Sequence, residues 1–147
     1  MKRVLITILI ITLGQSVFSQ ERINDLSIES IEYEANSRGF YQKMKVSKKT
    51  FVYSEDRARK KSKTVKISNK QWREIVNLAD KIKFKELSSF KAPSEKRKSD
   101  GAAHAQLKVF YKNDINESSN FDHGNPPVEI KDLVEYIINL SKSTNKL

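Results

Sequence analysis

Cysteine is absent from this chain of 147 residues. Its absence excludes disulfide bonds, catalysis by a thiolate, and metal sites that depend on cysteine ligands. It also excludes a lipid anchor of the bacterial lipoprotein type, because that anchor needs a cysteine directly after the signal sequence. A folded domain made from this chain must therefore be held together by its apolar core alone.

Long apolar stretches are also scarce, and the clearest one stands at the start of the chain. Lys2 and Arg3 precede an uncharged, mostly aliphatic stretch over residues 4–13, and compact side chains follow it. This order is typical of a secretory signal peptide, and we expect cleavage between Ser19 and Gln20. An uncleaved anchor is the rejected alternative, because a membrane-spanning helix needs roughly 20 apolar residues. The sequence therefore predicts export to the periplasm or the outside of the cell.

Acidic residues are outnumbered by basic ones. The net charge is +10, and it falls to +8 when Lys2 and Arg3 leave with the signal peptide. A positive surface attracts anionic neighbours such as lipid headgroups, lipopolysaccharide or acidic polymers. The densest basic run, residues 57–66, has no aromatic side chain for base stacking, and nucleic acid is not an expected partner of an exported chain. The run is interpreted either as a docking patch for anionic surfaces or as a solvated hairpin tip.

The mature chain has no internal repeat and no dividing linker. We expect a flexible lead over residues 20–27, a single domain over 28–142 and a polar tail over 143–147. Strands and helices are predicted from apolar residues at periods of two and 3.6. Strands are expected at 31–35, 40–46, 50–53, near 65–67, at 103–111 and at 115–121, and helices at 68–82 and from 126 to about 140. The order β-β-β-β-α-β-β-α predicts an α+β domain, with both helices packed on one face of an antiparallel sheet.

The first helix has the clearest local signals. Ser68 and Gln71 have the spacing of a capping box, in which each side chain bonds to the backbone N–H of the other residue. Apolar residues then fall on one face of the helix. They are Trp72, Ile75, Val76, Ala79 and Ile82. We therefore assign Trp72, the only tryptophan, to the core rather than to ligand contact.

The last two strands form a predicted hairpin whose register decides where both histidines lie. A three-residue turn over 112–114 pairs Tyr111 with Ile115 and Ala105 with Phe121. This register keeps the apolar residues of both strands on one face, whereas a two-residue turn would not.

The same register places His104 opposite Asp122, with His123 beside it and Asp100 entering at the same end. Imidazole and carboxylate groups suit zinc or a similar ion, and an Asp–His pair can act as a general base. A metal site of His104, Asp122 and His123 is therefore one hypothesis. In the other, these residues are structural: Asp122 accepts backbone N–H bonds from the turn over 124–127, with His104 as its partner.

A third interpretation is an anion site. The basic residues near this hairpin end are Arg38, Lys91, Lys96, Arg97 and Lys98. Together with histidine N–H groups and the N-terminus of the second helix, they could hold a carboxylate or phosphate. An anion is the more natural ligand for a basic chain, because the loop lysines would repel a metal ion.

Four loop sequences resemble those of a group of small exported proteins from Bacteroidota that carry no assigned function. They are SRGF at 37–40, KAPS at 91–94, DGAA at 100–103 and FDHGNPP at 121–127. The resemblance covers most of the mature chain and implies the periplasm or cell surface of such a bacterium. It supplies no activity and no site residues.

The sequence thus favours an exported, non-enzymatic domain that binds an anionic ligand or an envelope protein. Two alternatives stay open: a metal-binding protein or small hydrolase built on the His/Asp cluster, and an inhibitor or immunity-type protein that uses the exposed face of its sheet. No cofactor is expected, and no transmembrane segment after the signal peptide is removed.

Overall fold

The computed structural model describes residues 28–58 and 60–144. The predicted signal peptide and flexible lead lie outside these residues. Within the described ranges, no helix has the length and apolar character that crossing a membrane requires.

The described chain forms seven strands, two α-helices and three 3₁₀ helices. The strands are β1 (Ile28–Ser37), β2 (Phe40–Ser47), β3 (Thr50–Ser54), β4 (Lys63–Lys66), β5 (His104–Tyr111), β6 (Asp114–Glu117) and β7 (Phe121–Asp122). The α-helices are α1 (Asn69–Ala79) and α2 (Lys131–Thr144), and the 3₁₀ helices are η1 (Phe84–Ser89), η2 (Lys96–Ser99) and η3 (Val128–Ile130).

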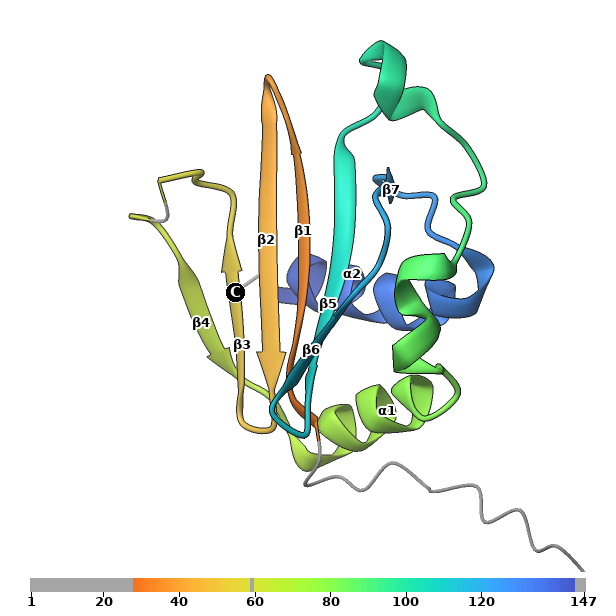
Figure 1. Cartoon of the computed structure of the whole chain (residues 1–147). Helices are drawn as coiled ribbons and strands as arrows, with labels where there is room; N and C mark the ends of the chain where they lie inside the picture. The colour runs from red at the N-terminus through yellow and green to blue at the C-terminus, as the bar shows by residue number, and fades with distance from the viewer. Residues whose placement is uncertain (1–27, 59, 145–147) are drawn as a thin grey trace, which may run out of the picture.

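All strands belong to one antiparallel sheet (Figure 1). Its order is β4-β3-β2-β1-β5-β6, and β7 pairs with the first residues of β5. The helix α2 passes behind the strands in the view of Figure 1. This α+β architecture confirms the predicted fold class. The short strand β7 and the 3₁₀ helices are additions to the predicted order.

The core lies between the helices and one face of the sheet. Alternate residues of β1 and β5, such as Tyr33 and Leu107, are fully buried. Apolar residues of both helices join the same core, among them Trp72, Ile75, Leu133, Val134 and Ile137. Trp72 is only 1 % exposed, which confirms its predicted place in the core.

The helix α1 begins as predicted, and α2 does not. Ser68 Oγ accepts the Gln71 N–H at 3.2 Å, and Gln71 Oε1 accepts the Ser68 N–H at 2.8 Å, which is the capping box. Pro127 precedes the 3₁₀ helix η3 instead of standing in the first turn of α2. The helix α2 runs to Thr144, so the segment predicted as a polar tail from residue 143 begins inside it.

The β5–β6 turn differs from the prediction. It has two residues, Lys112 and Asn113, both with positive φ (49° and 66°), and Tyr111 pairs with Asp114. Positive φ at both central positions is the mark of a type I′ turn, whose twist matches that of the flanking strands. The predicted three-residue turn is therefore wrong, and Ile115 lies opposite Phe110, where it is 59 % exposed.

The predicted register is nevertheless restored at the far end of the hairpin. Between β6 and β7 the returning chain carries one residue more than β5, and Ser118 takes up the irregularity. Its N–H donates to the Leu107 carbonyl at 2.9 Å, and its Oγ accepts the Leu107 N–H at 3.0 Å. As a result β7 pairs Ala105 with Phe121 and His104 with Asp122, as predicted.

The other face of the sheet carries charged residues in pairs. Lys43 Nζ lies 2.9 Å from Glu32 and 3.3 Å from Glu34, and Lys45 Nζ lies 3.0 Å from Glu32. Burial tends to raise the pKa of Glu32, but the two lysines lower it overall. Opposite charges are therefore largely balanced across this face.

Candidate functional site

Loops that lie far apart in sequence meet at one end of the molecule (Figure 1). The β1–β2 turn, the β3–β4 loop, the η2 loop and the start of β5 all lie at the end opposite α1 and the β5–β6 turn. We call this region, with β7, the loop end. Most of the predicted site residues belong to it.

Asp122 is the centre of the loop end. It is 2 % exposed, and its two carboxylate oxygens accept four hydrogen bonds. Oδ2 accepts from Ser94 Oγ at 2.6 Å and from the Lys96 N–H at 2.8 Å. Oδ1 accepts from the Arg97 N–H at 3.0 Å and from Arg97 Nη1 at 3.1 Å. A buried carboxylate is tolerated when its lone pairs are used in this way.

The charge of Asp122 is fixed by these donors. Burial alone would raise the pKa of Asp122, but the Ser94 hydroxyl, the Arg97 backbone and guanidinium, and the Lys96 backbone together hold it well below its ordinary value. The Arg97 side chain is itself only 10 % exposed and also donates to the Ser94 carbonyl at 2.7 Å. Asp122 therefore anchors the η2 loop to the sheet as a carboxylate.

His123 contacts the strands and not the η2 loop. Its Nδ1 lies 2.7 Å from the Tyr33 hydroxyl, and its ring centre lies 4.9 Å from that of Phe40. Burial lowers the pKa of His123, and the nearby charge of Lys142 lowers it further. The ring is therefore neutral near pH 7, so that Nδ1 accepts the hydrogen of Tyr33 and Nε2 carries the ring proton.

The predicted His/Asp cluster does not assemble. His104 pairs with Asp122 through the backbone, but its side chain is exposed and makes no hydrogen bond to Asp122. In the described part of the chain, no group of three histidine or carboxylate side chains could hold a metal ion. The geometry therefore does not support the hypothesis of a metal site at His104, Asp122 and His123, because donors from the η2 loop already occupy the Asp122 carboxylate.

The structural hypothesis for Asp122 had the right residue and the wrong partners. The carboxylate binds Ser94, Lys96 and Arg97, and the 124–127 turn is held by the Asp122 main-chain carbonyl, which accepts the Asn125 N–H at 2.9 Å. Asn125 Nδ2 also donates to Ser94 Oγ at 2.7 Å. Sequence reasoning missed these partners because 25 to 28 residues separate them from Asp122.

The predicted anion ligands share the loop end without converging on one point. Lys96 and Lys98 are exposed on η2, and Lys98 pairs with Glu95 at 2.7 Å. Lys91 and Arg97 line a shallow hollow that also contains Glu95. Arrayed in this way, the cations suit an extended anionic surface better than a single small anion.

The two remaining predicted residues stand at turns. Arg38 is exposed in the β1–β2 turn. Asp100 is exposed at the end of η2 in a left-handed conformation with φ 56°. Neither belongs to the group of side chains around Asp122.

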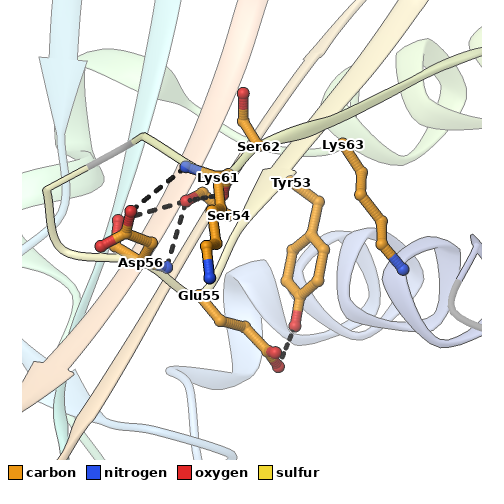
Figure 2. Close-up of a pocket in the computed structure, with 7 residues that line it drawn as sticks. All are labelled: Tyr53, Ser54, Glu55, Asp56, Lys61, Ser62 and Lys63. Carbon is orange, nitrogen blue, oxygen red and sulfur yellow. Dashed lines mark hydrogen bonds between the residues drawn. The ribbon is translucent and has the colours of Figure 1, made fainter.

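A second loop is also organised by a carboxylate, and sequence reasoning missed it (Figure 2). Asp56 Oδ1 accepts the Ala58 N–H at 3.0 Å, and Oδ2 accepts the Lys60 N–H at 2.9 Å. Oδ2 also accepts the Lys61 N–H at 3.1 Å, the bond of this group that Figure 2 draws. The available signal was an aspartate just after a strand, a position at which it often bonds to the backbone of the following residues.

Arg57 joins this loop to the β1–β2 turn. Its Nη2 donates to the carbonyls of Ser37 and Phe40 at 2.5 and 3.4 Å, and its guanidinium lies 5.7 Å from the centre of the Tyr41 ring. The Phe40 ring in turn packs against the ring of His123, which directly follows β7 in the chain. The loop end is therefore one connected structure.

Comparison with known proteins gives no further assignment. No family model matches the chain, and neither a curated protein nor a solved structure matches it significantly.

Proposed function

We propose that this protein is an exported, non-enzymatic binding domain of the cell envelope that binds an anionic partner through its loop end. Export follows from the N-terminal signal sequence, and the preference for anions follows from the positive net charge of the mature chain.

The observation that carries the proposal is the position of the loop-end carboxylates. Asp122 and Asp56 accept hydrogen bonds from loop backbones and so hold the loops in shape. Lys60 and Lys96 are exposed on those loops and form no ion pair within the described ranges. The result is a preorganised array of cations, which lowers the ordering cost of binding.

The alternatives receive less support from the geometry. A hydrolase would need Asp122 as a base or as an orienting group for His104, but all four of its hydrogen bonds go to the η2 loop and its pKa is depressed. An inhibitor that uses the exposed sheet face would meet charges that are already paired, as between Lys43 and Glu32. A pull-down from an envelope fraction tests this last alternative: recovery of one stoichiometric protein partner would favour it over the anion proposal.

The direct experiment measures binding of the mature protein to vesicles of phosphatidylcholine with and without phosphatidylglycerol. The double variant Lys60→Glu with Lys96→Glu should bind the anionic vesicles at least about 30-fold more weakly, since each lysine near such a surface contributes roughly 1 kcal/mol. Heparin in place of vesicles distinguishes a polymer from a lipid surface.

The matched control is Lys49→Glu with Lys70→Glu, which changes the net charge equally. Both residues are exposed, in the β2–β3 turn and at the start of α1, at the opposite end of the molecule (Figure 1). We expect this pair to weaken binding much less. Equal weakening by both pairs would show that only net charge matters, and no binding by the unmodified protein to vesicles or heparin would remove the proposal.

A further inference from the structure

A pocket separate from the η2 loop lies at the base of the β3–β4 loop (Figure 2). Its lining residues are Tyr53, Ser54, Glu55, Asp56, Lys61, Ser62 and Lys63, and its volume is about 360 Å³. Known small-molecule sites begin at roughly 300 Å³, so this volume suits a small ligand. In Figure 2 the Tyr53 ring stands between the side chains of Lys61 and Lys63, with Glu55 at its hydroxyl.

Hydrogen bonds join the two sides of the pocket wall. Asp56 accepts the backbone N–H groups of Lys60 and Lys61, as described above. Ser54 is 6 % exposed, and its Oγ donates to the Lys61 carbonyl at 2.9 Å and accepts the Asp56 N–H at 3.2 Å. These bonds hold Ser54 and Asp56 to Lys60 and Lys61, which reduces the ordering that a ligand would have to impose on this part of the wall.

Two opposite charges in this wall are not joined to each other. Glu55 and Lys61 are both exposed, and no ion pair between them forms in the part of the chain that the structure describes. A ligand with complementary charges at its two ends could therefore pair with both.

Hydrogen bonds at the Tyr53 end leave acceptors in excess. The Tyr53 hydroxyl donates to Glu55 Oε1, and its oxygen accepts from Gln42 Nε2 at 3.3 Å. This direction fixes the Gln42 amide, because the opposite orientation would place its oxygen against the Tyr53 oxygen, whose proton is already donated. Gln42 Oε1 is buried outside the pocket lining and has no hydrogen-bond partner among the described residues. Glu55, in contrast, is exposed at the pocket and can accept a hydrogen bond from an ammonium group.

We propose that the pocket binds a small zwitterion of amino-acid size, with its ammonium group at Glu55 and its anionic group at Lys61. This site is independent of the anion-binding function proposed for the loop-end surface. It differs from that function in the ligand, which must carry both charges.

The test is a titration of the mature protein, followed through the backbone amide NMR signals of residues 53–56 and 61–63. The probes are glycine, β-alanine and γ-aminobutyrate, in which the distance between the two charges increases. At least one should give saturable shifts, while acetate and methylammonium at equal concentration should bind about tenfold more weakly or not at all, since each makes one of the two ion pairs. Absence of saturable shifts with every zwitterion, or equally tight binding of acetate, would overturn the proposal.

Two variants locate the site. Glu55→Gln and Lys61→Met should each weaken the best zwitterion by about tenfold, as expected for the loss of one charge-assisted contact. Glu95→Gln and Lys98→Met remove an exposed pair elsewhere and should leave its affinity unchanged. Urea midpoints show whether each variant is folded, and unchanged affinity in a folded Glu55→Gln protein would rule out the assigned ammonium site. Vesicle binding uses Lys60 and Lys96, so the two proposals can fail separately.

Discussion

A single carboxylate determines the shape of the η2 loop. Asp122 accepts two hydrogen bonds from loop backbone, one from the Ser94 hydroxyl and one from the Arg97 guanidinium, which is itself almost fully buried. Removing one member of a buried ion pair leaves the other charge without compensation, and this costs more than the pair contributes. Although the η2 loop carries exposed lysines, its conformation therefore depends on the buried carboxylate of Asp122.

Asp122→Asn should lower the free energy of unfolding by roughly 3 kcal/mol, because it leaves Arg97 buried without a counter-charge and turns amide hydrogens toward other donors. Urea denaturation at neutral pH measures the loss. Glu95→Gln is the control: it breaks the exposed pair with Lys98, and we expect a change below about 0.5 kcal/mol. Similar small effects from both substitutions would show that the η2 loop is not held through Asp122.

His123 should make stability depend on pH. Its folded pKa is lowered by burial and by Lys142, so between that value and the unfolded pKa of about 6.5 the unfolded chain binds more protons. The stabilisation is therefore complete above about pH 6.5 and is lost as the pH falls toward the folded pKa, because protonation of Nδ1 removes the acceptor for Tyr33.

The measurement is the urea midpoint of three proteins between about pH 7.5 and 5.5, a range in which Asp122 stays ionised. The unmodified protein should lose stability as the pH falls, and His104→Asn should lose as much, since the His104 side chain is exposed. His123→Asn should have a flatter profile. An identical pH profile for His123→Asn and the unmodified protein would contradict the assignment.

Among the elements, the β5–β6 hairpin is the least expected in its details. Lys112 and Asn113 both adopt positive φ, a conformation in which an L-residue, asparagine included, is less stable than glycine. Asn113→Gly should therefore raise the free energy of unfolding by roughly 0.5–1 kcal/mol, since glycine occupies the second central position of a type I′ turn without steric cost. Chemical denaturation of the purified variant checks this value.

The β2–β3 turn provides the opposite case for a substitution by glycine. Lys49 is not among the described residues with positive φ, so Lys49→Gly relieves no backbone strain. It also raises the conformational entropy of the unfolded chain, which favours unfolding. We expect it to destabilise by roughly 0.5–1 kcal/mol. If both glycine substitutions change stability in the same direction, turn geometry does not explain the β5–β6 hairpin.

Elements with local signals could be predicted, and compensating irregularities could not. The capping box at Ser68 and the apolar stripe of α1 follow from neighbouring residues alone, and both are present in the structure. The β5–β6 turn was predicted with one residue too many, yet the pairing of His104 with Asp122 was right, because the irregularity at Ser118 adds that residue back. At that irregularity the Ser118 side chain, and not a backbone carbonyl, accepts the Leu107 N–H, and such a substitution leaves no periodic pattern in the sequence.

At the scale of the whole molecule, the sequence located the right end of the fold but not its contacts. Apolar alternation placed His104 opposite Asp122 with the η2 loop at the same end, and the structure pairs these two residues and bonds Asp122 to the η2 loop. Their actual partners come from long range: Tyr33 reaches His123 across 90 residues, and Ser94 reaches Asp122 across 28. Such pairs depend on how the sheet is ordered, which no local spacing reveals.

The order of the sheet also predicts where the molecule opens first. The central strand β1 pairs with β2 and β5 along most of its length and is largely buried, whereas β4 is a four-residue edge strand in which only Val65 is partly buried. Separating β4 from β3 therefore exposes little apolar surface, while separating β1 disrupts the core.

Amide hydrogen exchange followed by NMR at neutral pH tests this order. The hydrogen-bonded amides of β1 and β5 should exchange only through global unfolding, and those of β4 should open at a free energy lower by at least about 2 kcal/mol. Raising the urea concentration should accelerate exchange in β1 and β5 steeply and in β4 weakly, because local opening exposes little new surface. Equal protection and equal urea dependence in all three strands would mean that the sheet opens as one unit. The pocket at the base of the β3–β4 loop would then be as stable against opening as the core.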